Sequence, residues 1–391
     1  MKNHKLSFLL AFLLFSSCLA IAQNNEVIVG AERTDVYLPL LKGKKVALYS
    51  NHTGIVNGKH TLDLLLEKDV MVTAIFSPEH GFRGDAGAGD LIVSSVDEKT
   101  GVSIISLFDG KNEKPNIEAM KMFDVLIVDI QDVGLRYYTY PITMVRLMEA
   151  CAEQNKLMVI FDRPNLNGHY VDGPILDMKF KSGVGWLPVP VVHGLTLGEL
   201  AQMVNGENWL PNGLKCNLKV IECLNYTHQT KYILPVPPSP NLPNMTSIYL
   251  YASLCFFEAT PVSLGRGTNL PFQIYGHPNM KGYDFTFTPR SMKSALKPPQ
   301  LDRLCYGINL SGLSESELWT KGIDLSYLID AYTNLNMDNF FFSPFFEKLI
   351  GVDYVRKMII QGKTANEIKA MWQNDVEQFK QQRKRYLLYE E

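Results

Sequence analysis

Acidic residues follow two hydrophobic runs of the sequence, and they are the first candidates for chemistry. Glu79 lies in a Pro-Glu-His-Gly segment after the run 70–76, and Asp129 and Asp132 lie at the end of the run 125–130. Hydrolysis of a glycosidic bond usually needs one carboxyl group that protonates the leaving oxygen and a second that acts as base or nucleophile. Glu79 is therefore a candidate general acid, with Asp129 or Asp132 as its partner. The alternative for each carboxylate is helix capping or an ion pair with an arginine.

Arginines and tyrosines form a second group of candidates. Arg83, Arg136, Arg163 and Arg266 stand near predicted ends of strands or helices, and the segment 134–140 places three tyrosines beside Arg136. Guanidinium groups suit a carboxylate ligand, and aromatic rings suit the apolar face of a sugar. An acidic ligand would explain this grouping, and ordinary ion pairs with neighbouring carboxylates would explain it too.

Other kinds of catalytic site have weaker support. His80 and His193, with Glu79 and Asp129, could bind a metal, but their separations match no metal-binding motif. The GxSxG motif of serine hydrolases and the GxGxxG motif of dinucleotide-binding proteins are both absent from the sequence. We therefore predict neither a metal nor an organic cofactor.

The elements that must position these residues alternate along the first half of the chain. Short apolar, β-branched runs predict strands over 45–50, 70–76, 102–108, 125–130 and 157–161. Helical patterns cover 61–68, 140–154 and 196–205, and the last begins with the capping-box pair Thr196 and Glu199. Such alternation predicts an α/β fold with a doubly wound, mostly parallel sheet. Ligands bind outside the carboxyl ends of such strands, so the polar clusters after four of them predict one shared site.

The two ends of the chain differ from this pattern. Residues 1–22 resemble a secretory signal peptide, with Lys2 and Lys5 before an apolar run and a small-residue cleavage site at 20–22. A lipid anchor on Cys18 is the alternative, and either route leads out of the cytoplasm, most simply to the periplasm. We expect a catalytic domain over 23–278 and a smaller α+β auxiliary domain over 279–391, which opens with a basic, proline-containing stretch at 281–299.

Composition narrows the class of protein further. The 391 residues are 46% hydrophobic and 20% charged, which excludes a disordered chain. The formal net charge of −2 gives no basic excess that would indicate nucleic acid as a partner, and no stretch after the leader is apolar and long enough to span a membrane. The cysteines after the leader are too sparse for a disulfide framework, so we expect buried thiols, with a Cys216–Cys223 pair as the alternative.

Several ordered motifs resemble those of the bacterial exo-acting β-N-acetylmuramidases of the NamZ type. The matching segments are SPEHGFRGD (77–85), DIQDVGLRYYTY (129–140), FDRPN (161–165), VDGP (171–174), HGLTLGELA (193–201), PSPNLP (238–243), SLGRGTNLPF (263–272) and RYLLY (385–389). Departures from the family pattern occur at Leu135, Leu166 and Ala259, and they leave the charged positions intact.

This resemblance implies a Rossmann-like catalytic domain whose cleft with the auxiliary domain holds a terminal sugar. It also implies removal of N-acetylmuramic acid from the non-reducing end of peptidoglycan fragments, with muramyl saccharides as the substrate partners and Glu79 as the acid. The motif positions implied for substrate binding are His80, Arg83, Gln131, Arg136, Tyr137, Asp162, Arg163, His193, Asn241, Glu258, Arg266 and Thr268. A metal-dependent hydrolase and a non-catalytic cell-wall binding protein remain as alternatives, and the oligomeric state is open.

Overall fold

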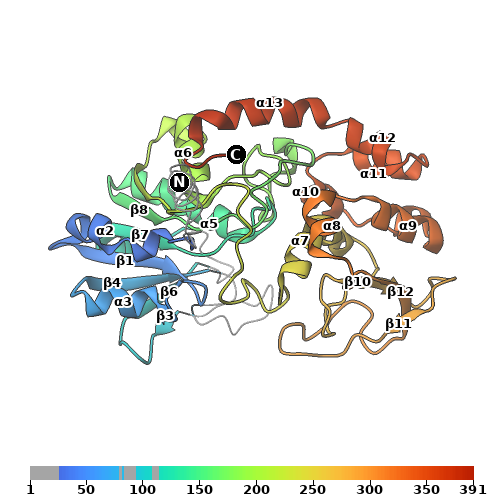
Figure 1. Cartoon of the computed structure of the whole chain (residues 1–391), viewed down its shortest axis with the longest axis horizontal. Helices are drawn as coiled ribbons and strands as arrows, with labels where there is room; N and C mark the ends of the chain where they lie inside the picture. The colour runs from blue at the N-terminus through green and yellow to red at the C-terminus, as the bar shows by residue number, and fades with distance from the viewer. Residues whose placement is uncertain (1–25, 79–81, 83–93, 108–113) are drawn as a thin grey trace, which may run out of the picture.

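A seven-stranded sheet forms the first half of the molecule (Figure 1). The computed structural model describes residues 26–78, 82, 94–107 and 114–391, without the side chain of Asn339. The strand order is β5 (Ser95–Val96), β6 (Ser103–Ser106), β4 (Met71–Ser77), β1 (Lys45–Ser50), β7 (Val125–Asp129), β8 (Leu157–Phe161) and β9 (Asn217–Ile221). All neighbours pair in parallel except β5 with β6.

The chain builds this sheet outward from its middle in two directions. It passes from β1 to β4 and β6 on one side, and then returns to lay β7, β8 and β9 on the other. The topological switch point therefore lies between β1 and β7, where Ser50 is in register with Asp129. Parallel doubly wound sheets bind ligands beyond the carboxyl ends of the strands at this point. The predicted α/β class and the five predicted strands are confirmed.

Helices cover both faces of the sheet. Val46 and Leu48 of β1 pack in one apolar cluster with α2 (Thr34–Leu41) and α3 (Thr61–Glu67). Ala47 and Tyr49 pack in a second cluster with α4 (Ile117–Lys121), α5 (Thr139–Glu153) and α6 (Leu197–Gly206). Successive side chains of a strand point to opposite faces, so a strand covered on both sides is apolar throughout. This explains the fully buried run of β7.

The second half of the chain is mainly helical. Its helices are α7 (Met245–Leu254), α8 (Glu315–Lys321), α9 (Ser326–Leu335), α10 (Phe345–Ile350), α11 (Tyr354–Ile360), α12 (Ala365–Ala370) and α13 (Gln373–Arg383). A small antiparallel sheet has the order β10 (Ile274–His277), β12 (Cys305–Asn309) and β11 (Phe285–Phe287). Strand β10 lies just before residue 278, where we expect the domain boundary, and it pairs with β12 beyond that residue. The boundary itself stays a prediction.

Several short elements complete the fold. The hairpin β2 (Ile55–Val56) and β3 (Lys59–His60) follows β1. The 3-10 helices are η1 (Gly30–Glu32), η2 (Met178–Phe180), η3 (Pro211–Gly213), η4 (Cys255–Ala259), η5 (Asp338–Phe340) and η6 (Lys384–Tyr386). Residues 1–22, the predicted leader, lie outside the described part of the chain.

The C-terminal segment returns to the first half of the molecule. Helix α13 crosses from the helical half to α6 in Figure 1, and the chain ends beside the seven-stranded sheet. Tyr389 Oη donates a hydrogen bond to Asp162 Oδ2 at 2.7 Å, and the Leu388 amide donates to Glu199 Oε1 at 2.8 Å. One apolar cluster runs from α5 and α6 to Trp372 and Phe379, so the two halves share a core.

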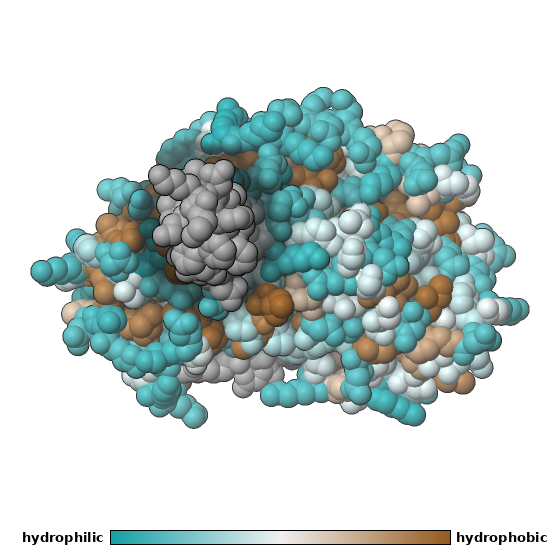
Figure 2. Space-filling model, viewed as in Figure 1, coloured by the Kyte–Doolittle hydropathy of each residue, from teal (hydrophilic) through white to brown (hydrophobic). Residues whose placement is uncertain are grey.

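The described part of the chain has a mainly polar surface on the face drawn in Figure 2, and its cysteines are buried thiols. Polar residues predominate on the face drawn in Figure 2, with apolar residues in small patches. None of the helices in the described part of the chain combines the length and hydrophobicity needed to cross a bilayer. The cysteines of this part are all buried and free, including Cys216 and Cys223, so the alternative disulfide between those two is not formed here.

Candidate active site

A hydrogen-bonded chain of polar groups fixes the proline-rich loop 235–243 to the switch point of the sheet. Asn51, which follows β1, donates from Nδ2 to Tyr140 Oη at 2.8 Å. Tyr140 Oη and Tyr138 Oη in turn donate to the Pro238 carbonyl oxygen at 3.3 and 2.9 Å. Both tyrosines come from the start of α5, which follows β7. The carboxyl ends of β1 and β7 therefore hold the loop that carries Asn241.

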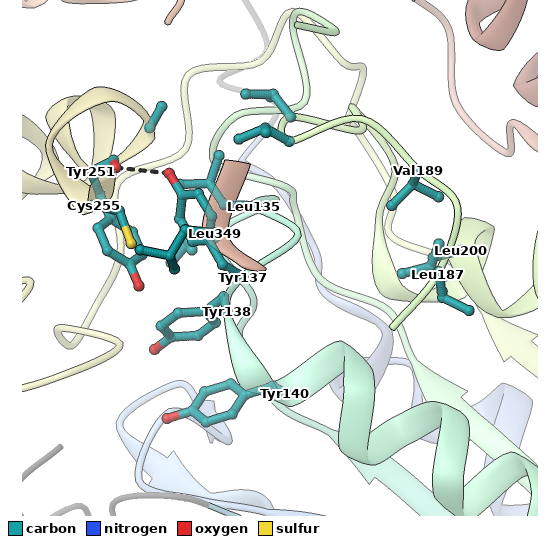
Figure 3. Close-up of a cluster of buried hydrophobic side chains, with 14 of the residues drawn as sticks. Leu135, Tyr137, Tyr138, Tyr140, Leu187, Val189, Leu200, Tyr251, Cys255 and Leu349 are labelled. Atoms are coloured by element: carbon teal, nitrogen blue, oxygen red, sulfur yellow. Dashed lines mark hydrogen bonds between the residues drawn. The ribbon is translucent and has the colours of Figure 1, made fainter. Parts of the chain in front are cut away.

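A cavity of about 670 Å³ opens beside this loop and reaches the helical half of the molecule. One wall is aromatic and includes Tyr137, Tyr138, Tyr251 and Phe272. Figure 3 shows Tyr137 and Tyr138, which lie one after the other just before α5, and Tyr251 across from Tyr137. Tyr137 Oη donates to the Tyr251 carbonyl oxygen at 2.8 Å, which fixes this wall. Its size and apolar lining suit one or two sugar rings.

Charged and amide groups also line the cavity. Glu258 of η4 and Arg266 pair with Nη2 and Oε1 2.5 Å apart, and their side chains are only 25% and 17% exposed. The Arg266 guanidinium lies 4.9 Å from the centre of the Phe272 ring. Asn241 donates from Nδ2 to the Ser294 carbonyl oxygen at 2.9 Å, while its buried Oδ1 has no partner among the described residues. Tyr137, Asn241, Glu258 and Arg266, all predicted for the site, therefore share one cavity.

Thr268 shapes the loop that carries Arg266 rather than lining the cavity. Its Oγ1 donates to the Gly265 carbonyl oxygen at 2.7 Å and accepts from the Leu270 amide at 3.0 Å. The loop bends sharply because Gly265 and Gly267 adopt φ values of +87° and +79°, which L side chains rarely adopt.

Asp129 and Arg163 form a buried ion pair. Arg163 Nε and Nη2 donate to the two carboxylate oxygens of Asp129 at 2.6 and 3.1 Å, and Thr61 Oγ1 also donates to Oδ2. The side chain of Arg163 is 3% exposed and that of Asp129 is 0% exposed. Both carboxylate oxygens of Asp129 therefore accept hydrogen bonds from Arg163 or Thr61. The predicted catalytic role of Asp129 stays a prediction.

Asp132 differs from Asp129 in its surroundings. Its Oδ2 accepts from the Gly134 amide at 2.9 Å, but Oδ1 is buried without a partner in the described part of the chain. Burial raises the pKa of Asp132 to about 7, against the lowering effect of the Gly134 and Val133 amides. Neighbouring Gln131 donates from Nε2 to the Asp132 and Pro164 carbonyls at 2.8 Å each. A carboxyl group with this pKa can both hold and release a proton near neutral pH.

Arg136 and His193 lie in the core beneath the site. Arg136 donates to four carbonyl oxygens, those of Pro174, Val189, Leu349 and Ile350, at 2.7–3.0 Å. Burial lowers the pKa of Arg136 to about 9, and burial next to Arg383 and Arg136 lowers the pKa of His193 to about 3. Arg136 therefore joins the loops 174–189 to helix α10, and its predicted contact with substrate stays a prediction.

Asp162 anchors elements from three parts of the chain. It accepts from Thr196 Oγ1 at 2.6 Å, from the Gly198 amide at 2.9 Å and from Tyr389 Oη at 2.7 Å. Burial raises the pKa of Asp162 to about 6. The side chain is fully buried, and in the structure it connects β8, the start of α6 and the C-terminal segment.

Three predicted site residues, Glu79, His80 and Arg83, lie outside the described residues. The flanking positions are described: Ser77 ends β4, next to β1 at the carboxyl edge of the sheet, and the Phe82 ring lies 4.8 Å from the ring of His60. No cluster of three or more potential metal ligands occurs within the described ranges.

Comparison with known proteins decides the family. The model of the N-terminal part of exo-beta-N-acetylmuramidase NamZ matches residues 46–246, and the model of its C-terminal part matches residues 249–389. The chain belongs to the NamZ family. It is 36% identical over 373 residues to the peptidoglycan beta-N-acetylmuramidase NamZ of Bacillus subtilis (strain 168), covering 90% of this chain and 89% of that protein.

Two solved structures from Bacteroides fragilis NCTC 9343 share the NamZ fold. Both are DUF1343 family proteins. One is 65% identical with a TM-score of 0.89, covering 94% of this chain and 99% of the other. The second is 29% identical with a TM-score of 0.79, covering 93% and 99%.

The structure adds cavity residues that sequence reasoning missed in this NamZ family member. The stretch Ser294 to Pro299, with Lys297 at its centre, forms one side of the cavity. The sequence of 281–299 is basic and contains prolines, but no local feature links that stretch to Asn241 or Arg266.

Proposed function

We propose that this chain is an exo-acting β-N-acetylmuramidase that removes terminal N-acetylmuramic acid from the non-reducing end of peptidoglycan fragments. The observation that carries the proposal is the cavity beside the loop 235–243, which combines an aromatic wall with the Arg266–Glu258 pair and Asn241 in a chain of the NamZ family. A sugar ring stacks on aromatic side chains, and its hydroxyl and acetamido groups need fixed amide and guanidinium partners.

In this proposal Glu79 protonates the departing glycosidic oxygen. It follows β4, whose carboxyl end lies beside that of β1 at the sheet edge that carries the cavity loops. Asp132 is the second carboxyl group that we favour, because one of its oxygens has no partner among the described residues. It would activate water or orient the 2-acetamido group. Asp129 is less suited, because Arg163 and Thr61 already occupy its oxygens.

The test uses defined disaccharides that end in N-acetylmuramic acid or in N-acetylglucosamine, with products identified by mass spectrometry. We expect release of free N-acetylmuramic acid from the first only. Glu79→Gln should lower kcat by at least about 100-fold, the usual range for loss of general acid catalysis, with an unchanged melting temperature. The exposed Glu98 supplies the control variant Glu98→Gln. Binding without any product from the wild-type protein would favour a cell-wall binding protein instead.

We also propose export to the periplasm. The support is the charged and apolar order of residues 2–15 and the small-residue site at 20–22. Mass measurement of the protein purified from a cell fraction tests this: cleavage after Ala22 leaves Gln23 as the first residue, whereas a lipid anchor leaves an acylated Cys18. A protein that keeps its first 22 residues in the cytoplasmic fraction would contradict export.

A further inference from the structure

Among the described residues, the cavity lining carries one positive charge in excess. The charged residues of this lining are Glu258, Arg266 and Lys297. Glu258 and Arg266 neutralise each other through their 2.5 Å ion pair. Lys297 is exposed and has no ion pair within the described residues. The ammonium group of Lys297 therefore has no counter-charge in the part of the chain that the structure describes.

The backbone around Lys297 is held from both sides. On one side, Asn241 Nδ2 donates to the Ser294 carbonyl oxygen at 2.9 Å. On the other, the Arg290 amide donates to the Gly267 carbonyl oxygen at 2.8 Å, and a Cβ at Gly267 would lie 2.5 Å from Pro298 Cγ. The segment is therefore packed between the loops that carry Asn241 and Arg266.

The sequence after Lys297 restricts the chain further. Pro298 and Pro299 follow it, and Pro298 is buried. A residue before proline is confined to extended backbone conformations, and each proline fixes its own φ near −65°. Lys297 is thus presented from a backbone that loses little conformational entropy when a ligand binds, which is the condition for a specific contact rather than a mobile surface charge.

We propose that Lys297 binds the lactyl carboxylate of the terminal muramic acid and thereby selects sugars whose lactyl acid is free. This inference rests on the proposed function. The lactyl carboxylate is the charge that distinguishes N-acetylmuramic acid from N-acetylglucosamine, and the Lys297 ammonium group, which has no ion pair among the described residues, matches it. Arg266, with its charge balanced by Glu258, serves the neutral polar groups of the sugar.

A consequence follows for substrates that carry peptide. When a peptide is attached, the lactyl carboxyl group becomes an amide and loses its charge. Lys297 then meets a neutral group, and its desolvation is no longer compensated by an ion pair. The enzyme should therefore act on muramic acid from which the peptide has been removed, which requires an amide-cleaving reaction before this one.

The experiment compares two chromogenic substrates, p-nitrophenyl β-N-acetylmuramide and the same compound with its lactyl carboxyl converted to a methylamide. For the wild-type protein we expect kcat/KM to be about tenfold or more higher for the free acid, the scale of a charge-assisted hydrogen bond. Lys297→Gln should lose this preference through a higher KM for the acid, so that its kcat/KM for the acid falls towards its kcat/KM for the amide. Lys297→Arg should retain most of it, and Lys293→Gln, on the same stretch but outside the cavity lining, should match the wild type.

Ionic strength provides an independent readout. Added salt should reduce the preference of the wild type for the acid and leave Lys297→Gln unaffected, because salt screens a partly exposed ion pair. A preference for the acid that survives in Lys297→Gln would overturn the inference and assign the carboxylate to another group. Failure of the wild type to cleave either substrate would instead count against the proposed function. Melting temperatures of all variants identify any loss of folding. If Lys297→Gln does not fold, Lys297→Arg is the test: it should retain most of the preference for the acid, and a loss of that preference in the folded Lys297→Arg protein would overturn the inference.

Discussion

Replacing Asp129 by asparagine is expected to destabilise the protein while leaving the folded fraction active. Arg163 contacts both oxygens of Asp129 from a position that is 3% exposed, and Thr61 adds a third hydrogen bond. Removing one partner of such a pair leaves a buried charge uncompensated, which costs about 3–5 kcal/mol. That is a large part of the 5–15 kcal/mol by which domains are usually stable.

The measurement is urea unfolding followed by tryptophan fluorescence, with activity corrected for the folded fraction. A double-mutant cycle with Arg163→Met isolates the pair, and the double variant should be more stable than the sum of the single changes predicts, by about 2 kcal/mol or more. Asp302→Asn, in the exposed Arg290–Asp302 pair, is the control, and such pairs usually contribute below about 1 kcal/mol. Wild-type stability together with a large loss of kcat in Asp129→Asn would refute this reasoning and place Asp129 in the chemistry.

Three further changes test other parts of the structure. Folded Asp132 keeps its proton up to about pH 7, whereas the unfolded chain releases it near pH 4, so stability falls as pH rises between these values. Asp132→Asn should remove this fall in the free energy of unfolding, which amounts to about 1.4 kcal/mol per pH unit and is measured by urea titrations at several pH values. An unchanged dependence of stability on pH would contradict the raised pKa of Asp132. Gly351→Ala should lower the melting temperature more than Gly362→Ala: both glycines have positive φ, but only at Gly351 would a Cβ lie 2.5 Å from Arg136 Nη2. Dialysis against EDTA should leave the rate of hydrolysis unchanged. A loss of activity that is reversed by adding a divalent cation would favour the metal-dependent alternative.

Local sequence signals predicted most of the sheet. Five strands were expected within a few residues of their observed bounds, because apolar runs of four to seven residues mark strands buried on both faces. The capping box at Thr196 and Glu199 likewise places the start of α6. The apolar pattern does not predict strand β9, because Asn217 and Lys219 are polar and exposed and Leu218 between them is only half-buried. An edge strand needs the neighbouring strand for its identification, and local composition does not show that neighbour.

The functions of the charged residues were less accessible from sequence. The substrate contact of Arg136 stays a prediction, and the sequence does not indicate that its guanidinium binds carbonyl oxygens up to 214 residues away along the chain. Asp129 and Arg163 both stood in predicted polar clusters, but nothing local showed that they pair with each other. The sequence does not mark Lys297 as an individual residue, because the role that we propose for it depends on the pairing of Glu258 with Arg266 in the folded protein.

The sequence by itself determined the order of strands and helices, the edge of the sheet where polar residues gather, and the family motifs. These follow from hydrophobic periodicity and from short segments, which are properties of neighbouring residues. Only the tertiary structure decided which charged side chains pair with other protein groups and which remain available to a ligand. Ion pairing acts over a few ångströms and depends on burial, and both are set by the packing of segments that lie far apart in the chain.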